Sequence, residues 1–167
     1  MAFVCDVAED VIQGHFQRHG SAYVVVVPIG YDDEEDKSYT LLVTLDILPG
    51  VEYEFTYCIV EHDGATNSEY CYWSGADVAK FIGKEDRATI LGCLASVTAH
   101  LLRAVRPRHV TMCSWDVNLP EKAKRKHFLI ARVFEACGYE VHTFDEYHGQ
   151  SVWCMELREH REVDKLK

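Results

Sequence analysis

The last third of the chain carries the pattern that most restricts the fold. A strand-like apolar run over residues 108–115 is followed by a long helical pattern that ends at Cys137-Gly138, and then by alternating runs over residues 139–145 and 151–157. Glycine directly after a helix supplies the left-handed residue that commonly ends it. The two alternating runs flank a Tyr-His-Gly segment, which predicts a hairpin. The chain therefore ends as strand, helix and two paired strands.

The first two thirds predict two helices and four strands. Residues 6–18 have apolar side chains near helical spacing, after two acids placed like a capping box. Residues 85–105 repeat apolar side chains every three or four positions, which predicts a helix that lays one stripe on a sheet. β-Branched or alternating runs predict strands over residues 23–29, 39–48, 51–61 and 70–73.

Short polar segments predict the connections. Residues 32–36 are all acidic, so they repel one another and we expect a solvated loop. Pro49-Gly50 has the residues of a type II turn. Before the last helix, Asn118 is expected to cap the first turn and Pro120 to begin it.

These elements predict one domain over residues 1–167, with residues 158–167 as a frayed, charged tail. The expected fold is α+β, with a central mixed, mostly antiparallel sheet of about seven strands flanked by helices. The sheet is expected to be mixed because a strand-helix-strand passage makes a right-handed crossover. An open sheet has exposed strand edges, which favours a homodimer.

Composition and charge narrow the function classes. The formal charge of -10 argues against a nucleic-acid partner, because affinity for a phosphate backbone comes from Lys and Arg. Seven scattered cysteines without a CxxC pair exclude zinc-finger and thioredoxin-type motifs and favour a reducing compartment. No basic leader with an apolar core begins the chain, and no apolar run approaches the ~20 residues of a bilayer span. We expect a cytoplasmic protein with no membrane partner.

Residues 133–139, Val-Phe-Glu-Ala-Cys-Gly-Tyr, resemble the helix end and following strand start of the GCN5-related N-acetyltransferase (GNAT) family. The order of elements resembles that family over nearly the whole chain, whereas the specific residues cover only the last third. The resemblance implies a GNAT-like fold and an acyl-CoA-dependent N-acyltransferase, with acetyl-CoA or CoA as the cofactor. It also implies that acyl-CoA enters the splay between the fourth and fifth expected strands.

The GNAT family binds the acyl-CoA pyrophosphate on a glycine-rich loop at a helix start, because backbone N–H groups there attract anions and glycine allows close approach. In the corresponding residues 81–88 one glycine remains, and two acids place negative charge where the pyrophosphate would lie. The family motif is therefore absent. The resemblance still points to Gly83, Lys84 and Arg87 as cofactor contacts, with the two basic residues compensating the acids in part.

A second set of candidates follows the strand-like run over residues 108–115. Polar groups at strand ends often converge over a sheet, next to the start of a helix. Asp116 is a catalytic candidate at this place, and Asn118 is a candidate for cofactor binding. A turn at Asp116 and a helix cap at Asn118 explain the same two residues without a functional role.

Proton transfer has no obvious donor in this chain. Many GNAT members carry a tyrosine four residues before the glycine, which protonates the leaving CoA thiolate, and Phe134 occupies that position and has no proton to give. His148, beside Tyr147 in the terminal loop, is the best acid–base candidate, and a solvated loop histidine is the alternative. Cys137 is a further donor candidate, but its apolar neighbours favour a core position.

Residues 122–127 form the one concentrated basic run. The simplest interpretation is a solvated start of the last helix, and the alternative is a docking site for phosphate, nucleotide or an acidic partner. None of the nine histidines stands in an HxH or HExxH pattern, so we expect no metal site.

Two functions stay open on the sequence. The first is a GNAT-type N-acyltransferase with an altered cofactor loop and an unidentified substrate. The second is a catalytically inactive GNAT-like domain that binds a protein or a small molecule through its acidic surface or its basic helix start.

Overall fold

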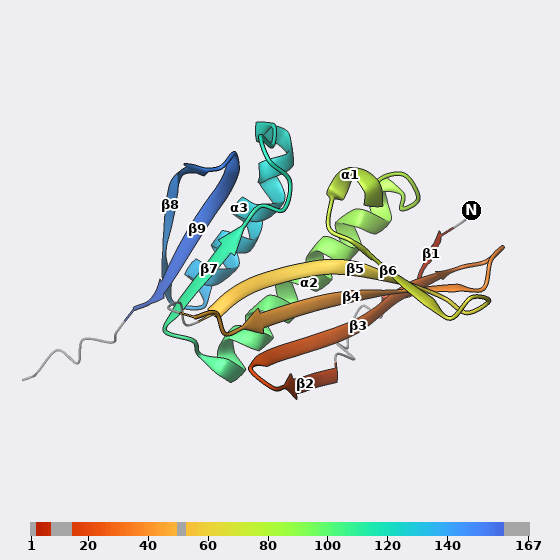
Figure 1. Cartoon of the computed structure of the whole chain (residues 1–167), viewed down its shortest axis with the longest axis horizontal. Coiled ribbons are helices and arrows are strands. Elements are labelled where there is room, and N and C mark those ends of the chain that lie inside the picture. Colours follow the sequence, from red (N-terminus) through yellow and green to blue (C-terminus); the bar gives the residue numbers. More distant parts are fainter. Residues whose placement is uncertain (1–2, 8–14, 50–52, 159–167) are drawn as a thin grey trace, which may run out of the picture.

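The structure is a computed structural model that describes residues 3–7, 15–49 and 53–158 (Figure 1). Its helices are α1 (Gly75–Val78), α2 (Lys84–Val105) and α3 (Glu121–Ala136). Its strands are β1 (Phe3–Cys5), β2 (His15–His19), β3 (Ala22–Asp32), β4 (Lys37–Asp46), β5 (Tyr53–Asp63), β6 (Ser68–Tyr72), β7 (His109–Cys113), β8 (Tyr139–Tyr147) and β9 (Gln150–Leu157).

The strands form one mixed sheet in the order β1-β3-β4-β5-β7-β9-β8, with β2 paired to β3 and β6 paired to β5. Every strand pair in the described residues is antiparallel except β5 with β7. This confirms the expected α+β fold with a mixed, mostly antiparallel sheet. The sheet has nine strands, where the sequence predicts about seven. β1 and β2 are the two additional strands.

β2 lies where the sequence predicts the end of a helix, and that prediction is wrong for residues 15–18. β2 pairs antiparallel with β3, and Gly20 closes the hairpin with φ +57°. The long β-branched strand β3 offers a backbone ladder, which outweighs the helical spacing of a few apolar side chains. Residues 8–14 of the expected helix lie outside the described residues, as does Gly50 of the expected turn.

The other expected elements are confirmed with small shifts at their ends. Gly138 follows α3 with φ +93°, as the C-terminal helix signal predicts, and β8 and β9 form the terminal hairpin. Residues 33–36 connect β3 and β4 as exposed bends, in agreement with the solvated loop. Asp32 differs from them, because it is buried and its Oδ1 accepts the N–H groups of Glu34 and Glu35 at 2.9 and 3.2 Å.

α2 and α3 lie on the same face of the sheet (Figure 1). α2 contacts β3 and β4, α3 contacts β8, and the two helices contact each other. Fully buried side chains between these layers include Leu101 of α2, Phe134 of α3 and Trp153 of β9. Burial of one large apolar side chain stabilises the fold by roughly 1.5–3 kcal/mol. The two helices and the sheet are therefore joined by one buried apolar layer.

α2 is the one helix among the described residues that is long and apolar enough to cross a membrane, by length and composition alone. Its most apolar window has a mean hydropathy of 1.5, and 33% of that window is buried inside the protein. The sequence analysis did not anticipate a segment of this kind.

β5 and β7 separate soon after they meet. Among the described residues, Tyr53 pairs with Val110 and Glu54 with Thr111, and no later residue of β5 pairs with β7. β6 pairs with residues 59–63 on the same edge of β5, because β4 occupies the other edge. Residues 55–58 of β5 therefore have no partner strand on this edge. An opening in the sheet lies between β6 and β7.

Candidate functional site

Two adjoining cavities occupy the opening beside β5. The larger one, the helix-side cavity, has a volume of about 790 Å³ and lies among β5, α1, the first half of α2 and the start of α3. The smaller one, the gap cavity, has a volume of about 390 Å³ and lies between β5 and β7. Both are lined by Tyr57, Trp73, Asp116, Leu119 and Lys126. Two ligands, one in each cavity, would meet at these shared side chains.

The helix-side cavity combines apolar walls with basic residues. α2 and β5 contribute aliphatic side chains, and three basic residues, Arg87, Arg125 and Lys126, also line it. Asp116 is the one acid among its lining residues. A cavity of this composition suits a ligand that has a long apolar part and an anionic part.

Arg87 is the expected cofactor contact that the structure places at a cavity. Its guanidinium donates a hydrogen bond to the C=O of Ile82, which holds the side chain at the start of α2. Gly83 is the N-cap of α2, and the carboxylate of Asp86 comes within 3.3 Å of the place where a Cβ on Gly83 would lie. Lys84 is exposed and lines neither cavity. The start of α2 is therefore covered by its own acid, and the basic groups lie further along the cavity.

Lys126 points from α3 into the place where the two cavities meet. Its Nζ lies 5.6 Å from the ring centroid of Tyr57, and 3.5 Å from the place where a Cβ on Gly75 of α1 would lie. Burial lowers the pKa of Lys126, and the nearby carboxylate of Asp116 opposes this shift. Among the described residues, Lys126 makes no ion pair or hydrogen bond. A desolvated ammonium group without a direct counterion is a ready partner for an anion or for a proton transfer.

His127, the next residue of α3, lines the gap cavity. Its side chain is 4% exposed, and its ring stacks on Trp153 with centroids 5.0 Å apart and an interplanar angle of 8°. Burial and the adjacent Lys126 lower the pKa of His127 to about 4, so the imidazole is neutral at physiological pH. Its Nδ1 and the hydroxyl of Tyr57 are buried with no hydrogen-bond partner among the described residues. Buried polar atoms of this kind are normally satisfied, so a bound molecule is the natural partner.

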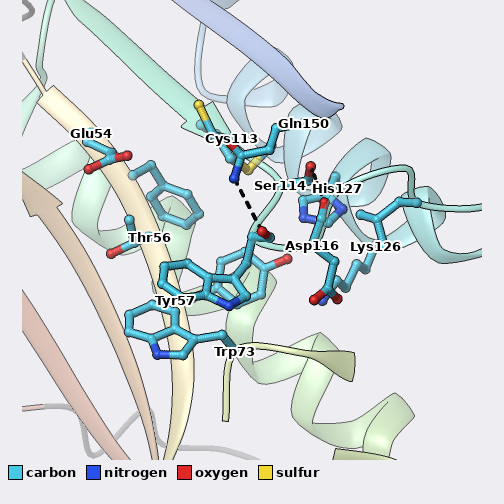
Figure 2. Close-up of a pocket in the computed structure, with 14 residues that line it drawn as sticks. Glu54, Thr56, Tyr57, Trp73, Cys113, Ser114, Asp116, Lys126, His127 and Gln150 are labelled. Carbon is cyan, nitrogen blue, oxygen red and sulfur yellow. Dashed lines mark hydrogen bonds between the residues drawn. The ribbon is translucent and has the colours of Figure 1, made fainter. Parts of the chain in front are cut away.

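Buried Ser114 holds the segment after β7 in one shape. Its N–H donates to the C=O of Ser151 at 2.9 Å, its Oγ donates to the C=O of Asp116 at 3.0 Å, and the same Oγ accepts the N–H of Ser151 at 2.9 Å. Gln150 Nε2 donates to the C=O of Trp115 at 3.2 Å, as Figure 2 shows. The segment that carries Trp115 and Asp116 is therefore held by hydrogen bonds to the first residues of β9.

Two indole rings meet across the opening. Trp73 follows β6 and Trp115 follows β7, and their rings stack with centroids 5.1 Å apart and an interplanar angle of 21°. Trp115 is 63% exposed although it is large and apolar. Both rings line the gap cavity, together with the carboxylates of Glu54 and Asp116. Exposed aromatic faces beside carboxylates are typical of sites that bind organic cations.

The other sequence-based candidates lie away from this opening. Tyr147 is 67% exposed, and His148 occupies the β8–β9 turn with φ +51°, with its ring against that of Tyr147 at a centroid distance of 4.3 Å. Neither residue lines the two cavities. Asp116 lines both. The structure thus brings Asp116 and Arg87 to the opening and leaves Tyr147 and His148 outside it.

Asn118 does not cap α3, so this prediction is wrong. The N-cap is Pro120, and no side chain caps this helix end. Asn118 instead has φ +52°, and its N–H donates to the C=O of Gly149 at 2.6 Å. Asparagine tolerates the left-handed conformation well, which explains its place in this tight connection.

Lys126 and His127 line the opening, although the sequence does not single them out as site candidates. A solvated helix start is wrong for these two residues, which are half-buried and buried, and a docking site at residues 122–127 stays a prediction. A usable signal was present, because His127 lies three and seven residues before buried Ile130 and Phe134, on the same face of the helix. The basic residues around His127 made this apolar face of the helix difficult to recognise in the sequence.

Phe134 is fully buried in the core, where its ring meets those of Phe55 and Tyr139 edge-on at 5.5 and 5.4 Å. It lines neither cavity. Lys126 and His127 are the residues of α3 that line the gap cavity.

No protein-family model matches this chain, and neither a curated protein nor a solved structure matches it. Among the described residues, no group of three or more His, Cys, Asp or Glu side chains is placed to hold a metal ion.

Proposed function

We propose that this chain is a GNAT-like, acyl-CoA-dependent N-acyltransferase whose cofactor lies in the helix-side cavity. The observation that carries the proposal is the separation of β5 from β7 after the Glu54–Thr111 pair, which leaves one edge of residues 55–58 without a partner strand beside two cavities that share a wall. An unpaired strand edge offers N–H and C=O groups to an extended, amide-containing ligand. The pantetheine arm of CoA is a ligand of this chemistry.

The basic residues support an anionic cofactor. Arg87, Arg125 and Lys126 line the helix-side cavity together with aliphatic side chains, which suits a phosphorylated carrier with an uncharged arm. In this arrangement Arg87 and Arg125 hold phosphate, and Lys126 lies nearest the thioester. The start of α2 is not the phosphate site, because the carboxylate of Asp86 lies against it.

The shared wall of the two cavities is where the acyl group changes partner. A neutral amine in the gap cavity attacks the thioester carbonyl, an N–C bond forms, and the C–S bond breaks. The leaving thiolate takes a proton from the ammonium group of Lys126, and Lys126 regains a proton from the acylated nitrogen. The lowered pKa of Lys126 favours this donation. Asp116 keeps Lys126 oriented by its charge.

The second candidate function is a GNAT-like binding module that performs no transfer. Two observations favour it: the acids in the first turn of α2, and the burial of Phe134 at the position where the family resemblance expects a tyrosine. This candidate keeps the helix-side cavity as a ligand site. It differs from the first candidate only in the absence of turnover.

Calorimetric titration with CoA and with acetyl-CoA tests the proposal. We expect micromolar binding, which corresponds to about -8 kcal/mol. Acetyl-CoA turnover in the presence of a mixture of amines would then separate the transferase from the binding module. Absence of binding for both cofactors, with folded protein, contradicts the proposal.

Charge-reversal variants locate the phosphate. Arg87→Glu is expected to abolish binding, whereas Arg103→Glu at the far end of α2 is a control that carries the same charge change outside both cavities. Lys84→Glu decides between two placements of the anion. Loss of affinity in Lys84→Glu would put the phosphate at the start of α2, and unchanged affinity would put it beside Arg87 inside the helix-side cavity.

A further inference from the structure

The gap cavity has an uneven distribution of charge. Figure 2 shows Glu54 on the β5 side of this cavity and Lys126 and His127 on the opposite, α3 side, and the indole of Trp73 lines the same cavity. The carboxylate of Asp116 also lines this cavity, but it lies near Lys126 and offsets the charge of that residue. The β5 side therefore favours a cation more than the α3 side does. A ligand that fits both sides has one charged and one uncharged polar end.

We propose that the gap cavity binds a short alkyl diamine, with one nitrogen held as an ammonium between Glu54 and the Trp73–Trp115 pair and the other held neutral beside Lys126 and His127. The proposal rests on the proposed function for the fate of the neutral nitrogen, which is the acyl acceptor. It goes further in naming the class of acceptor.

The ammonium end is supported by charge and by aromatic faces. The carboxylate of Glu54 makes no ion pair or hydrogen bond with any described residue, so its charge is available. The stacked indoles of Trp73 and Trp115 lie in the same cavity, and the exposed ring of Trp115 has a free face. A cation over an indole is stabilised by about 0.5–1 kcal/mol at an exposed site and by more when it is desolvated.

The neutral end is supported by groups that oppose a second positive charge. Lys126 is itself a cation, and His127 is a buried, neutral imidazole whose Nδ1 has no hydrogen-bond partner among the described residues. An amine next to an ammonium group, in a site shielded from water, loses its proton readily. His127 Nδ1 and the hydroxyl of Tyr57 are then available to hydrogen-bond the neutral amine.

The walls of the site are held before any ligand arrives. The hydrogen bonds of Ser114 fix the segment of Trp115 and Asp116 to β9, and the ring of His127 stacks on Trp153. A preformed site loses little conformational entropy on binding, so a ligand with few atoms can bind measurably. The cavity volume of about 390 Å³ lies within the range of sites for small molecules, roughly 300–1,000 Å³.

Intrinsic fluorescence gives a direct test without any cofactor. Two of the three tryptophans line the gap cavity, so a bound cation is expected to change the emission. The probes are 1,4-diaminobutane, butylamine and 1,4-butanediol, which have the same chain length and differ in their end groups. We expect the diamine to bind about tenfold more tightly than butylamine, because butylamine cannot supply both a charged and a neutral nitrogen, and the diol not to bind.

Two variants test the placement of the ammonium group. Glu54→Gln and Trp115→Ala are each expected to weaken diamine binding about tenfold. Trp115 is exposed, so its truncation leaves the core intact. Glu69→Gln is the matched control, since Glu69 is an exposed acid of β6 that lines neither cavity. Equal affinity for all three probes, or diamine affinity that both variants leave unchanged, overturns the proposal.

The outcomes of this test and of the cofactor titration are separate. Diamine binding without CoA binding would keep the cation site and remove the transferase. CoA binding with turnover of a monoamine, and no preference for the diamine, would keep the transferase and remove the diamine. Binding of both, with transfer to one nitrogen of the diamine only, is the result expected.

Discussion

β4 and β5 pair continuously from Lys37 opposite Asp63 to Asp46 opposite Glu54, whereas the pairing of β5 with β7 among the described residues ends at Glu54 opposite Thr111. The first seam is closed by a full ladder and by cross-strand contacts such as the hydroxyls of Thr44 and Thr56, 2.6 Å apart. The second seam leaves backbone groups without a partner strand and buried side-chain atoms without a hydrogen bond. The hydroxyl of Tyr57 and Nδ1 of His127 are atoms of this kind at the gap cavity, whereas the hydroxyl of Tyr39 is one in the continuous half.

This contrast indicates that the open seam, and not the continuous ladder, is the place for a functional site. Polar groups that a folded chain normally satisfies are left free at the shared wall of the cavities, as happens at binding and catalytic sites. The long strands and α2 provide the rigid support that such a site requires. Substitutions in the two halves of the sheet should therefore have different effects on stability and on activity.

The largest effect is expected from core truncation on either side of the seam. Leu45→Ala in β4 and Trp153→Ala in β9 each remove a fully buried side chain, and each should lower the free energy of unfolding by about 2–5 kcal/mol. Urea unfolding followed by circular dichroism measures both. A single transition in both variants is expected, because α2 and α3 contact each other across the halves. Two separate transitions would mean that the halves unfold independently.

A pH-dependent loss of stability should follow from His127 at the open seam. The folded-state pKa is lowered to about 4 from 6.5, so below pH 6.5 the unfolded chain takes up a proton that the folded protein does not. Stability should therefore fall as the pH drops from about 6.5 to 4, by at most about 3 kcal/mol. His127→Phe should flatten this part of the profile while keeping a flat ring over Trp153. An unaltered slope in His127→Phe would contradict the assignment.

A pair of glycine substitutions should act in opposite directions. Gly138→Ala should lower the free energy of unfolding by roughly 1–2 kcal/mol, because its φ of +93° disfavours any side chain. Gly92→Ala within α2 should raise it by roughly 0.5–1 kcal/mol, because a helical alanine loses less entropy. Neither added Cβ meets an atom within 4 Å, so packing does not complicate the comparison. Thermal unfolding of both variants provides the test.

Lys126→Met is expected to have the smallest effect on stability. Its effect on acyl transfer is expected to be large. Replacing a desolvated ammonium by an apolar side chain of similar length should change the free energy of unfolding by less than about 1 kcal/mol, in the stabilising direction. Acyl transfer should fall at least about tenfold, because the leaving thiolate loses its proton donor. Lys80→Met, which removes an exposed lysine outside both cavities, is the control. Equal turnover by both variants would remove Lys126 from the mechanism.

Much of the fold could be predicted from local patterns. The apolar repeat of residues 85–105, the β-branched run of β3 and the Cys137-Gly138 helix end each produce the element that they predict. The wrong helix prediction at residues 15–18 arose because a non-local contact decides their structure. These residues are decided by pairing with β3, and a partner strand is not visible in a short local window.

The candidate site was only partly predictable. Arg87 and Asp116 are polar residues at the ends of elements, where sites commonly lie, and both line a cavity. Lys126 and His127 were obscured by the charges around them, and Tyr147 and His148 attracted attention by residue type alone. Residue type indicates what a side chain can do, but not which side chains share a cavity.

Local patterns in the sequence were enough to predict the two long helices, the helix end at Gly138 and the terminal hairpin, because short-range spacing and backbone preferences set these features. Only the tertiary structure decided that β5 and β7 separate after Glu54 and Thr111, and that Lys126, His127, Trp73 and Trp115 come together there. These residues are far apart along the chain. Their meeting depends on strand register and on the packing of α3, which arise from the whole core and from no local segment.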